Sequence, residues 1–342
     1  MKAVRFHTFG GLEVLRYEDV HKPAPGPNEV ILQVKAAALN HLDVWVRGGA
    51  RERKIPLPHI PGSDGSGIIA EVGGAVDFIR PGDTALISPG ISCGHCMMCL
   101  GGRDNLCPSY HVLGTMEDGT YAEFVRIPAV NVVAIPVGMD FNEAAAVPLV
   151  FLTAWHMLVT LAGIRSGETV LVHGAGSGVG TAAIQIAKLL AARVFTTAGS
   201  EEKLAKAKEL GAEELIDHTR KDFVAEIRRI TDNKGVDVVV EHIGGEFFEK
   251  SLTVLARGGR LVTCGATTEY AGKVDLRYVY SRHLTIHGSY MGTKRELHEV
   301  LRFFESRKLR PVVDKVFPLM EATEAQRWME ERKNFGKIVL SV

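Results

Sequence analysis

An excess of charge of either sign is missing from this chain. Its 342 residues carry 40 Lys and Arg against 40 Asp and Glu, so the formal net charge is zero. No overall positive field exists to attract nucleic acid or an anionic membrane surface. Long apolar runs are missing too, since no stretch approaches the roughly 20 uninterrupted apolar residues of a membrane helix. Neither a nucleic-acid partner nor a membrane partner is therefore expected.

The N-terminal sequence MKAVRFHTFGG also lacks the apolar core and small-residue cleavage site of a secretory signal. A cytoplasmic location is therefore the expectation. Hydrophobic residues make up 46% of the chain and charged residues 23%, as in folded proteins rather than disordered ones. A chain of 342 residues is too long for one ordinary hydrophobic core, which favours two domains.

Cysteine is scarce, and four of the five cysteines stand close together in the spacing C-x2-C-x2-C-x7-C. A secreted disulfide scaffold spreads its cysteines through a much smaller chain, whereas four thiolates suit one tetrahedral Zn2+. Four protein ligands leave no open position for water or substrate, so the predicted zinc is structural. The alternatives are a redox pair or four unrelated thiols. The predicted ligands are Cys93, Cys96, Cys99 and Cys107.

The part of the chain before Phe141 has the pattern of β structure. Short apolar runs such as Val30–Val34 are separated by Gly, Pro and Asp turns. Closely spaced strands of this kind indicate a small barrel or sandwich. At Phe141 the pattern changes, and Asn142 is predicted to cap a helical run that is interrupted at Pro148 and ends near Gly163.

From Glu168 onward, buried strands alternate with amphipathic helices. The strand pattern ETVLVHGAG precedes the helix pattern TAAIQIAKLLA, and strand patterns such as VDVVVEHIG and GGRLVTCGA follow. Continuous apolar strands that alternate with helices predict a doubly wound parallel sheet. The tail from Lys294 has two more helix patterns and ends in the strand pattern KIVLSV.

A glycine-rich turn connects the first strand of this region to its first helix. Such a turn brings backbone N–H groups against a diphosphate at the positive end of the helix. The motif departs from G-x-G-x-x-G, because Val179 stands where the third glycine would be. The strand–turn–helix context predicts a dinucleotide site, and the alternative is a turn needed only for close helix–sheet packing. The predicted turn residues are Gly174, Gly176, Ser177, Gly178, Val179 and Gly180.

The sequence TTAGSEEK at the end of the second strand bears on the choice of cofactor. An Asp or Glu about 20 residues after the glycine motif holds the ribose 2′-hydroxyl of NAD, and Ala198 stands at that position. Without the carboxylate a 2′-phosphate is not repelled, and Ser200 and Lys203 are candidates to bind it. NADP(H) is therefore favoured over NAD(H). The alternative is that Ser200 is only a helix N-cap, followed by two acidic residues that favour the first turn.

With these features in order, the chain resembles the medium-chain dehydrogenase/reductase superfamily, which includes zinc-type alcohol dehydrogenases and quinone oxidoreductases. The resemblance covers essentially the whole length, and the four-cysteine loop is its most specific part. It implies an α/β protein with a GroES-like β-barrel catalytic domain and a Rossmann domain with a doubly wound parallel sheet. The implied ranges are 1–147 for the catalytic domain with its zinc loop at 93–107, 148–290 for the Rossmann domain, and 291–342 for a segment returning to the catalytic domain.

Alcohol dehydrogenases of this superfamily also hold a catalytic zinc with Cys, His and Cys ligands. The resemblance places Asn40, Ser63 and Leu149 at the three ligand positions. An amide, a hydroxyl and an alkyl group do not supply the thiolates and the imidazole that zinc requires there. The chain is thus expected to keep the structural zinc and to lack the catalytic one. Donors for a makeshift site, which more often support a fold, remain at His41, Asp43 and Asp64.

The resemblance further implies the residues of the reaction site. Asn40 and Ser63 are expected to donate hydrogen bonds to the substrate oxygen with the help of His41, and Thr153 to face the nicotinamide. The alternative for each polar residue is a satisfied hydrogen-bonding role in the fold. Further implied cofactor contacts are His242, Ile243, Cys264, Gly265, Ala266, Tyr290, Met291 and Lys337.

Hydride transfer belongs to the cofactor, while the protein positions it and stabilises negative charge that develops on the acceptor. Without a Lewis acid, electron-poor acceptors suit the site better than unactivated alcohols. The sequence therefore predicts an NAD(P)(H)-dependent oxidoreductase that acts on a small-molecule carbonyl, enone or quinone without a catalytic metal. The alternatives are an alcohol dehydrogenase that uses NAD(H) and a catalytically silent NADPH-binding protein. The resemblance also implies a homodimer or homotetramer paired through edge strands near Leu284–Gly288.

Overall fold

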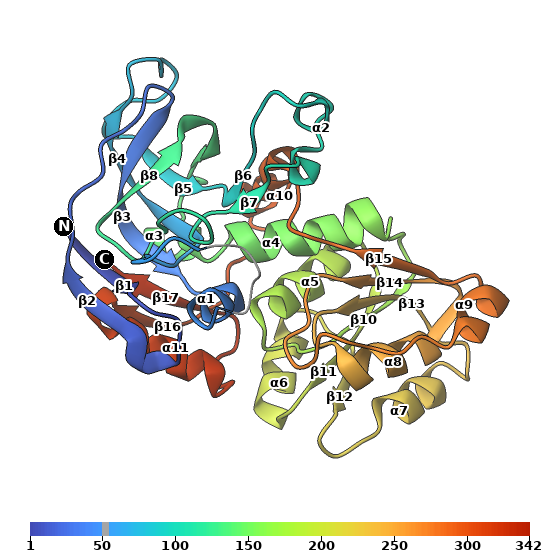
Figure 1. Cartoon of the computed structure of the whole chain (residues 1–342). Coiled ribbons are helices and arrows are strands. Elements are labelled where there is room, and N and C mark those ends of the chain that lie inside the picture. Colours follow the sequence, from blue (N-terminus) through green and yellow to red (C-terminus); the bar gives the residue numbers. More distant parts are fainter. Residues whose placement is uncertain (50–54) are drawn as a thin grey trace. The chain divides into compact units, whose positions relative to one another are not determined.

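The computed structural model describes residues 1–49 and 55–342, and the chain forms two structural units. Unit 1 contains Met1–Val150 and Thr293–Val342, and unit 2 contains Phe151–Gly292. The chain leaves unit 1 within helix α4, which spans Pro148–Trp155. Each unit has its own main β-sheet (Figure 1). In the described ranges no helix is both long enough and apolar enough to cross a membrane.

Unit 1 is built on a seven-stranded sheet with the order β16-β17-β3-β4-β5-β9, in which β8 also pairs with β3. All pairings are antiparallel except that between β16 and β17. The apolar run Val30–Val34 lies within β3, as the sequence pattern predicts. The strands are β3 (Glu29–Ala38), β4 (Asp64–Val72), β5 (Thr84–Ile87), β8 (Phe124–Pro128), β9 (Val132–Ala134), β16 (Val313–Pro318) and β17 (Lys337–Ser341). Two small sheets pair β1 (Lys2–Phe6) with β2 (Leu15–Asp19) and β6 (Gly90–Ile91) with β7 (His111–Val112).

The helices of unit 1 correct one prediction. The N-cap of the helical run is Asp140, not Asn142, because the Asp140 carboxylate accepts the Glu143 N–H at 2.8 Å. Glu143 in turn accepts the Asp140 N–H at 3.2 Å, which completes a capping box. The run is divided into α3 and α4, and a π-helical segment at His156–Leu161 follows α4. The helices are α1 (His41–Arg47), α2 (Met97–Leu100), α3 (Phe141–Ala145), α10 (Lys294–Glu305) and α11 (Ala322–Glu330).

Unit 2 is built on a six-stranded parallel sheet with the order β12-β11-β10-β13-β14-β15. Counted from β10, this is the order 3-2-1-4-5-6 of the doubly wound dinucleotide-binding fold. The strands are β10 (Thr169–Val172), β11 (Arg193–Ala198), β12 (Glu214–Asp217), β13 (Val236–Glu241), β14 (Leu255–Thr263) and β15 (Thr285–Gly288). The helices are α5 (Gly178–Leu189), α6 (Glu201–Glu209), α7 (Phe223–Ile230), α8 (Gly245–Thr253) and α9 (Leu276–Arg282).

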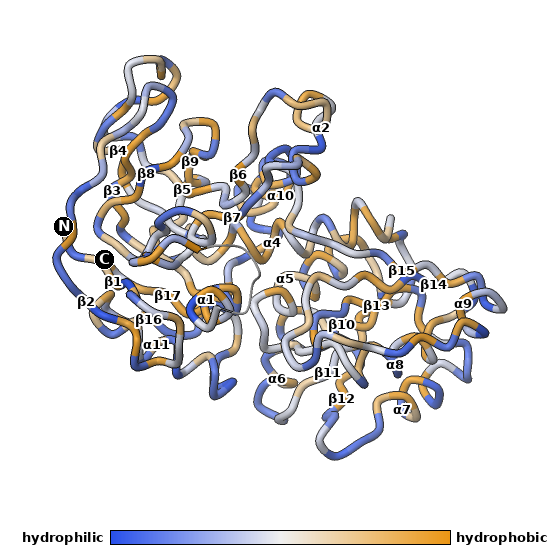
Figure 2. The backbone as a smooth tube through the Cα atoms, viewed as in Figure 1, coloured by the Kyte–Doolittle hydropathy of each residue, from blue (hydrophilic) through white to orange (hydrophobic). Residues whose placement is uncertain are grey.

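The core of unit 2 lies on both faces of this sheet. Leu171 belongs to a buried cluster that includes Phe223 of α7 and Leu252 of α8. Its neighbours Val170 and Val172 point to the opposite face and are also fully buried. Helices therefore cover both faces, which explains why the strands are apolar along their length (Figure 2). The carboxyl ends of the parallel strands meet at one edge, where the predicted cofactor residues follow them.

In unit 1 the strand register brings three remote segments together. Strands β3 and β4 pair Ala38 with Asp64, and strands β17 and β3 pair Val339 with the same Ala38. Because the β17–β3 pairing is antiparallel, Lys337 comes opposite Asn40, two residues beyond Ala38. Asn40, Asp64 and Lys337 therefore lie at one end of the sheet.

Candidate active site and structural metal centre

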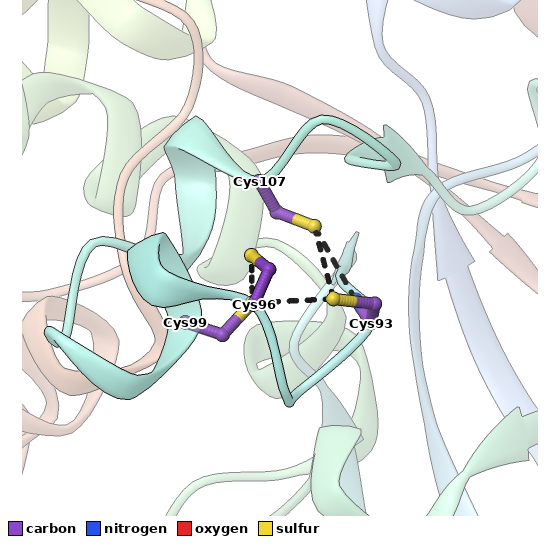
Figure 3. A group of neighbouring side chains, drawn as sticks. All are labelled: Cys93, Cys96, Cys99 and Cys107. Carbon is purple, nitrogen blue, oxygen red and sulfur yellow. Dashed lines mark hydrogen bonds between the residues drawn. The ribbon is translucent and has the colours of Figure 1, made fainter.

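The four clustered cysteines converge in unit 1 (Figure 3). Their sulfur atoms all lie within 4.8 Å of one another, with distances of 3.5 Å from Cys107 to Cys93 and 3.9 Å from Cys93 to Cys99. A tetrahedron of Zn–S bonds of ~2.3 Å has S–S edges of ~3.8 Å. All four are free thiols. The thiols therefore fit a zinc ion, which they would hold as four ligands.

The backbone around the loop favours the thiolate form that zinc needs. Hydrogen bonds from the backbone N–H groups of His95 and Cys96 lower the pKa of Cys93 to about 6. The ring of His95 bonds the Cys93 carbonyl oxygen through Nδ1 at 2.8 Å, so it serves the loop's backbone. The four cysteines alone would therefore supply the ligands of the metal centre.

The loop is joined to the start of helix α10. Asp104 accepts the backbone N–H and the ammonium of Lys294, each at 3.3 Å, and the ammonium also reaches Ser92 Oγ at 3.2 Å. Lys294 follows Thr293, where the chain returns to unit 1. The metal loop therefore anchors the segment at which the chain re-enters this unit.

A second polar cluster of unit 1 surrounds the buried carboxylate of Asp64. Its Oδ2 accepts the Asn40 amide at 2.9 Å and the Lys337 ammonium at 3.0 Å, and its Oδ1 accepts the Leu149 N–H at 2.9 Å. Leu149 lies in the first turn of α4, where backbone N–H groups lack intrahelical acceptors. Removing one partner of a buried ion pair typically costs about 3–5 kcal/mol, so this cluster is a strong local constraint.

Asn40 is more fully engaged than a substrate-binding amide would be. Its Nδ2 donates to Asp64 and, at 3.4 Å, to the Ala38 carbonyl oxygen, while its Oδ1 accepts the Lys337 ammonium. An amide has two N–H hydrogens, and both are directed to protein acceptors. In the structure the Asn40 side chain thus joins Asp64 to Lys337, and the direct contact with substrate that the resemblance implies stays a prediction.

Ser63 is placed differently. Its hydroxyl is fully buried and has no hydrogen-bond partner among the described residues. The preceding Gly62 has φ of +107°, and a Cβ there would meet Tyr121 at 2.4 Å, so only glycine fits this tight entry to β4. A buried hydroxyl without a partner is costly in a native fold, and a ligand oxygen is one way to satisfy it.

Asp43 is a buried acid beside this cluster. Its Oδ2 accepts the Asn40 N–H and the Tyr121 hydroxyl, both at 2.9 Å. Burial raises the pKa of Asp43 to about 6, and burial also raises the pKa of Tyr121. His41 is on the same helix, and its ring meets Trp45 edge-on at 5.0 Å. Burial and then the charge of Arg332 lower the pKa of His41, which favours a neutral imidazole.

The phosphate turn of unit 2 has the geometry that a dinucleotide requires. Ser177 caps α5 by accepting the Gly180 N–H at 2.8 Å, which leaves the first-turn N–H groups of Gly178 and Val179 without intrahelical acceptors. Gly174 has φ of +64°, and a Cβ on Gly180 would lie 2.3 Å from the Gly174 carbonyl oxygen. The close approach of strand and helix thus depends on these glycines.

His242 reaches this turn from the end of β13. Its Nε2 lies 2.8 Å from Ser177 Oγ, and a Cβ on Gly174 would lie 3.0 Å from its ring. Sequence reasoning predicts His242 as a cofactor contact but gives no sign of its bond to Ser177. The pair joins two segments that are separated in the sequence by α5, β11, α6, β12, α7 and β13.

The residues predicted to choose the cofactor lie around the start of α6. Ser200 caps the helix by accepting the Lys203 N–H at 3.3 Å, as the N-cap alternative expects. The two acids that would oppose a phosphate are both paired with cations, Glu201 with Arg220 and Glu202 with Lys206. A capping hydroxyl accepts one hydrogen bond and keeps its own hydrogen to donate. The N-cap therefore does not prevent Ser200 from binding an anion.

The loops after β13 and β14 run side by side at the same edge. The Thr267 N–H donates to the His242 carbonyl oxygen at 3.1 Å, and Gly244 pairs with Glu269. Burial raises the pKa of Cys264 to about 12, so its thiol stays protonated and is a poor nucleophile. The other predicted contacts in this region lie in the loops after β13, β14 and β15: Ile243, Gly265, Ala266 and Tyr290.

Thr153 and Met291 are also brought together within unit 2. The Thr153 hydroxyl lies 3.8 Å from the Met291 sulfur, and both residues are buried. The predicted contact of Thr153 with the nicotinamide and that of Met291 with the cofactor stay predictions. Gly176 lies in the phosphate turn between Gly174 and Ser177, as predicted from its place in the motif.

Two family models match the chain. The model described as "Alcohol dehydrogenase GroES-like domain" matches residues 26–137, and that described as "Zinc-binding dehydrogenase" matches residues 178–306. The chain is 33% identical over 353 residues to the NAD-dependent alcohol dehydrogenase of Sulfolobus acidocaldarius, with 100% of each chain covered. It is 30% identical over 332 residues to the quinone oxidoreductase of Homo sapiens, with 95% of this chain and 92% of that protein covered.

A solved structure of an NAD-dependent alcohol dehydrogenase has a TM-score of 0.97 and 52% identity, and it covers 100% of both chains. The chain belongs to the medium-chain dehydrogenase/reductase superfamily. It is an oxidoreductase of that type, with a GroES-like unit and a Rossmann unit. The predicted family and fold class are thereby confirmed, and a structural zinc and a nicotinamide cofactor belong to this assignment.

The catalytic zinc of zinc-dependent members does not fit the residues of this chain. At the positions that the resemblance assigns to the ligands, Asn40 is bonded to neighbouring protein groups and Ser63 offers a hydroxyl. The Leu149 side chain has no atom that could bind a metal ion. Asp64 is held by Lys337, and Asp43 by Tyr121, so the makeshift site is not assembled. Within residues 1–49 and 55–342, the four cysteines are the one group of three or more His, Cys, Asp or Glu side chains placed to hold an ion.

Metal analysis tests the zinc centre. The protein is expected to hold about one zinc ion per chain, because four thiolates close one coordination sphere. Cys107→Ser is expected to lose most of the zinc and to lower Tm by about 5–10 °C, measured by mass spectrometry and thermal melting. Cys264→Ser, which changes the distant thiol, should leave both values as in the wild type. Two zinc ions per chain would contradict the assignment of the three altered ligand positions.

Asp43 is expected to make stability depend on pH. Burial raises the pKa of Asp43 from its ordinary value of 3.8 to about 6, so between these pH values the folded state binds the proton more tightly than the unfolded state does. Its contribution to the free energy of unfolding therefore falls as pH rises from about 4 to about 6. Relative to the wild type, Asp43→Asn should gain about 2–3 kcal/mol over that range, measured by urea unfolding. Asp77→Asn, at an exposed position of unit 1, should show no such gain, and equal slopes for both variants would refute the assignment.

Proposed function

We propose that the protein is an NADP(H)-dependent oxidoreductase that transfers hydride between the cofactor and a carbonyl, enone or quinone without a catalytic metal. The observation that carries the proposal is the Ser63 hydroxyl. It is buried and has no partner among the described residues. The resemblance also assigns Ser63 to a position where zinc-dependent members have a ligand. The hydroxyl is therefore suited to meet an oxygen that a metal ion would otherwise polarise.

When bound, a nicotinamide cofactor would provide the hydride chemistry, as a donor to the electrophilic carbon of the substrate or as an acceptor in the reverse direction. As the new C–H bond forms, negative charge grows on the substrate oxygen. Ser63 donates a hydrogen bond to that oxygen, and a proton from water completes the reduction. Asn40 takes part by holding Asp64, the residue that follows Ser63, through its bond of 2.9 Å. The buried surroundings strengthen the Ser63 hydrogen bond, because little solvent competes for it.

The substrate class follows from this weak polarising group. A single hydroxyl stabilises an oxyanion less than a metal ion does, so acceptors that are already electron-poor are favoured. Quinones, enones and activated ketones meet that condition. The relatives support the same range of substrates, because one is named a quinone oxidoreductase and another an alcohol dehydrogenase.

The preference for NADP(H) rests on the end of β11 and the start of α6. Ala198 stands where an acid would bind the ribose 2′-hydroxyl of NAD, and Ser200 keeps a hydrogen to donate. Pairing of Glu201 and Glu202 with nearby cations lowers their repulsion of a phosphate. An NAD(H)-dependent alcohol dehydrogenase is the second candidate, favoured by the 52% identity to a structure of that description.

We further propose a homodimer or homotetramer built through strand β15. This strand is the last in the sheet of unit 2, and Ile286 on it is 38% exposed. An open strand edge with an exposed apolar side chain is suited to pair with its own copy, which would extend the sheet across a two-fold axis.

Turnover with a panel of acceptors tests the proposal. The wild type should oxidise NADPH with a quinone, an enone or an aromatic ketone, and a chelator should leave the initial rate unchanged. Ser63→Ala should lower kcat/KM by about 10–100-fold and leave the Kd of NADPH within about twofold, because one oxyanion donor is lost. Ser88→Ala is the matched control, since Ser88 Oγ is also buried without a partner in the part of the chain described. Binding of NADPH without turnover of any acceptor would instead favour the catalytically silent protein.

Variants of Ser200 test the choice of cofactor. Ser200→Asp keeps an N-cap side chain and adds a negative charge, so the Kd of NADPH should rise about tenfold or more. Ser200→Asn keeps a neutral N-cap and is the matched control, with a smaller rise expected. The Kd of NADH should change by less than about threefold in both variants, measured by fluorescence titration. Tighter binding of NADH than of NADPH by the wild type would favour the NAD(H)-dependent alternative.

A further inference from the structure

Three segments of unit 1 that are remote in the sequence meet at one carboxylate. Asp64 accepts the Leu149 N–H through Oδ1 and the Asn40 amide through Oδ2, each at 2.9 Å. The resemblance assigns Leu149 and Asn40 to two of the three positions where zinc-dependent members carry metal ligands. Ser63 stands at the third and directly precedes Asp64 in the chain. One side chain therefore joins the segments that a catalytic zinc would join.

A buried ammonium holds this carboxylate in place. Lys337 Nζ donates to Asp64 Oδ2 at 3.0 Å, to Asn40 Oδ1 at 2.6 Å and to the Leu39 carbonyl oxygen at 2.6 Å. The side chains of Lys337 and Asp64 are 4% and 0% exposed. An ammonium has three hydrogens, and these three acceptors use all of them. The Lys337 ammonium is therefore fully engaged within unit 1, and its implied contact with the cofactor stays a prediction.

We propose that Lys337 is a positioning residue which, through Asp64, takes the place of a catalytic zinc in tying these three segments together and so fixes the Ser63 hydroxyl. The proposal rests on the proposed function, in which Ser63 binds the substrate oxygen. Five hydrogen bonds from and to Asp64, Asn40 and Lys337 replace the metal–ligand bonds. Because Ser63 is bonded covalently to Asp64, a shift of the Asp64 carboxylate moves the hydroxyl with it.

A double-mutant cycle between Lys337 and Ser63 tests the proposal. Lys337→Met should lower kcat/KM for the acceptor by about tenfold or more, while the Kd of NADPH stays within about twofold. If Lys337 acts through Ser63, then Ser63→Ala should cost less than about threefold in the Lys337→Met background, against about tenfold or more in the wild type. Lys308→Met, at an exposed lysine of unit 1, is the matched control and should leave the cost of Ser63→Ala unchanged.

Two results would overturn the proposal. Equal costs of Ser63→Ala in both backgrounds would show that Lys337 acts independently of Ser63. A rise in the Kd of NADPH as large as the fall in kcat/KM would return Lys337 to the cofactor site. If Lys337→Met does not fold, the cycle is run on Asp64→Asn combined with Lys337→Met, which removes both buried charges and leaves neither unpaired.

Hydrogen exchange separates this proposal from the proposed function. The Leu149 amide should exchange about tenfold faster in Lys337→Met than in the wild type, because its acceptor is no longer held. This readout needs no substrate. If the wild type lacks turnover but the Leu149 amide exchanges faster in Lys337→Met than in the wild type, the hydride-transfer function is refuted. The role of Lys337 in holding the three segments together is then retained. Unchanged exchange of the Leu149 amide would refute the role of Lys337 in holding the three segments together.

Discussion

The pairing of Asp64 with Lys337 is the constraint on which the interior of unit 1 depends. Both charges are buried, and each is stable there only because the other is present. The carboxylate fixes the N-terminal turn of α4 and the cap of α1, and the ammonium fixes strand β17 against both. A catalytic metal ion would require thiolates and an imidazole at positions 40, 63 and 149. The ion pair requires only that the strand register bring two opposite charges together.

This arrangement separates two roles that zinc plays in the superfamily. The four cysteines keep the geometry for a structural ion, which stabilises a loop and through Asp104 the start of α10. In the proposed function the chemical role passes to protein groups, which polarise a substrate oxygen less than a metal ion does. A hydroxyl at Ser63 is adequate for acceptors whose carbon already attracts hydride. The proposed preference for electron-poor substrates thus follows from the chemistry of the donor, and it does not require a different fold.

Unit 2 keeps the glycine-rich turn and the capped helix N-terminus that suit a dinucleotide, although its motif departs from G-x-G-x-x-G. Glycines at 174 and 180 allow strand and helix to approach, and Ser177 caps α5. Val179 in place of the motif's third glycine is tolerated because Gly180, one residue further on, makes the close contact with the Gly174 carbonyl oxygen. His242, which follows β13, the neighbour of β10 in the sheet, adds a bond to Ser177 and so ties the phosphate turn to the loop after β13.

The sequence by itself determined the four-cysteine metal centre, the parallel sheet and the phosphate turn, because each depends on local spacing or on a period along one element. It did not reveal the capping of α3 by Asp140, where a neighbouring acid competed with Asn142. Only the tertiary structure decided that the Asn40 amide bonds Asp64, that the Ser63 hydroxyl has no partner among the described residues, and that Lys337 pairs with Asp64. The physical reason is register: antiparallel pairing brings residues 40, 64 and 337 together, and no pattern within one segment encodes such a meeting.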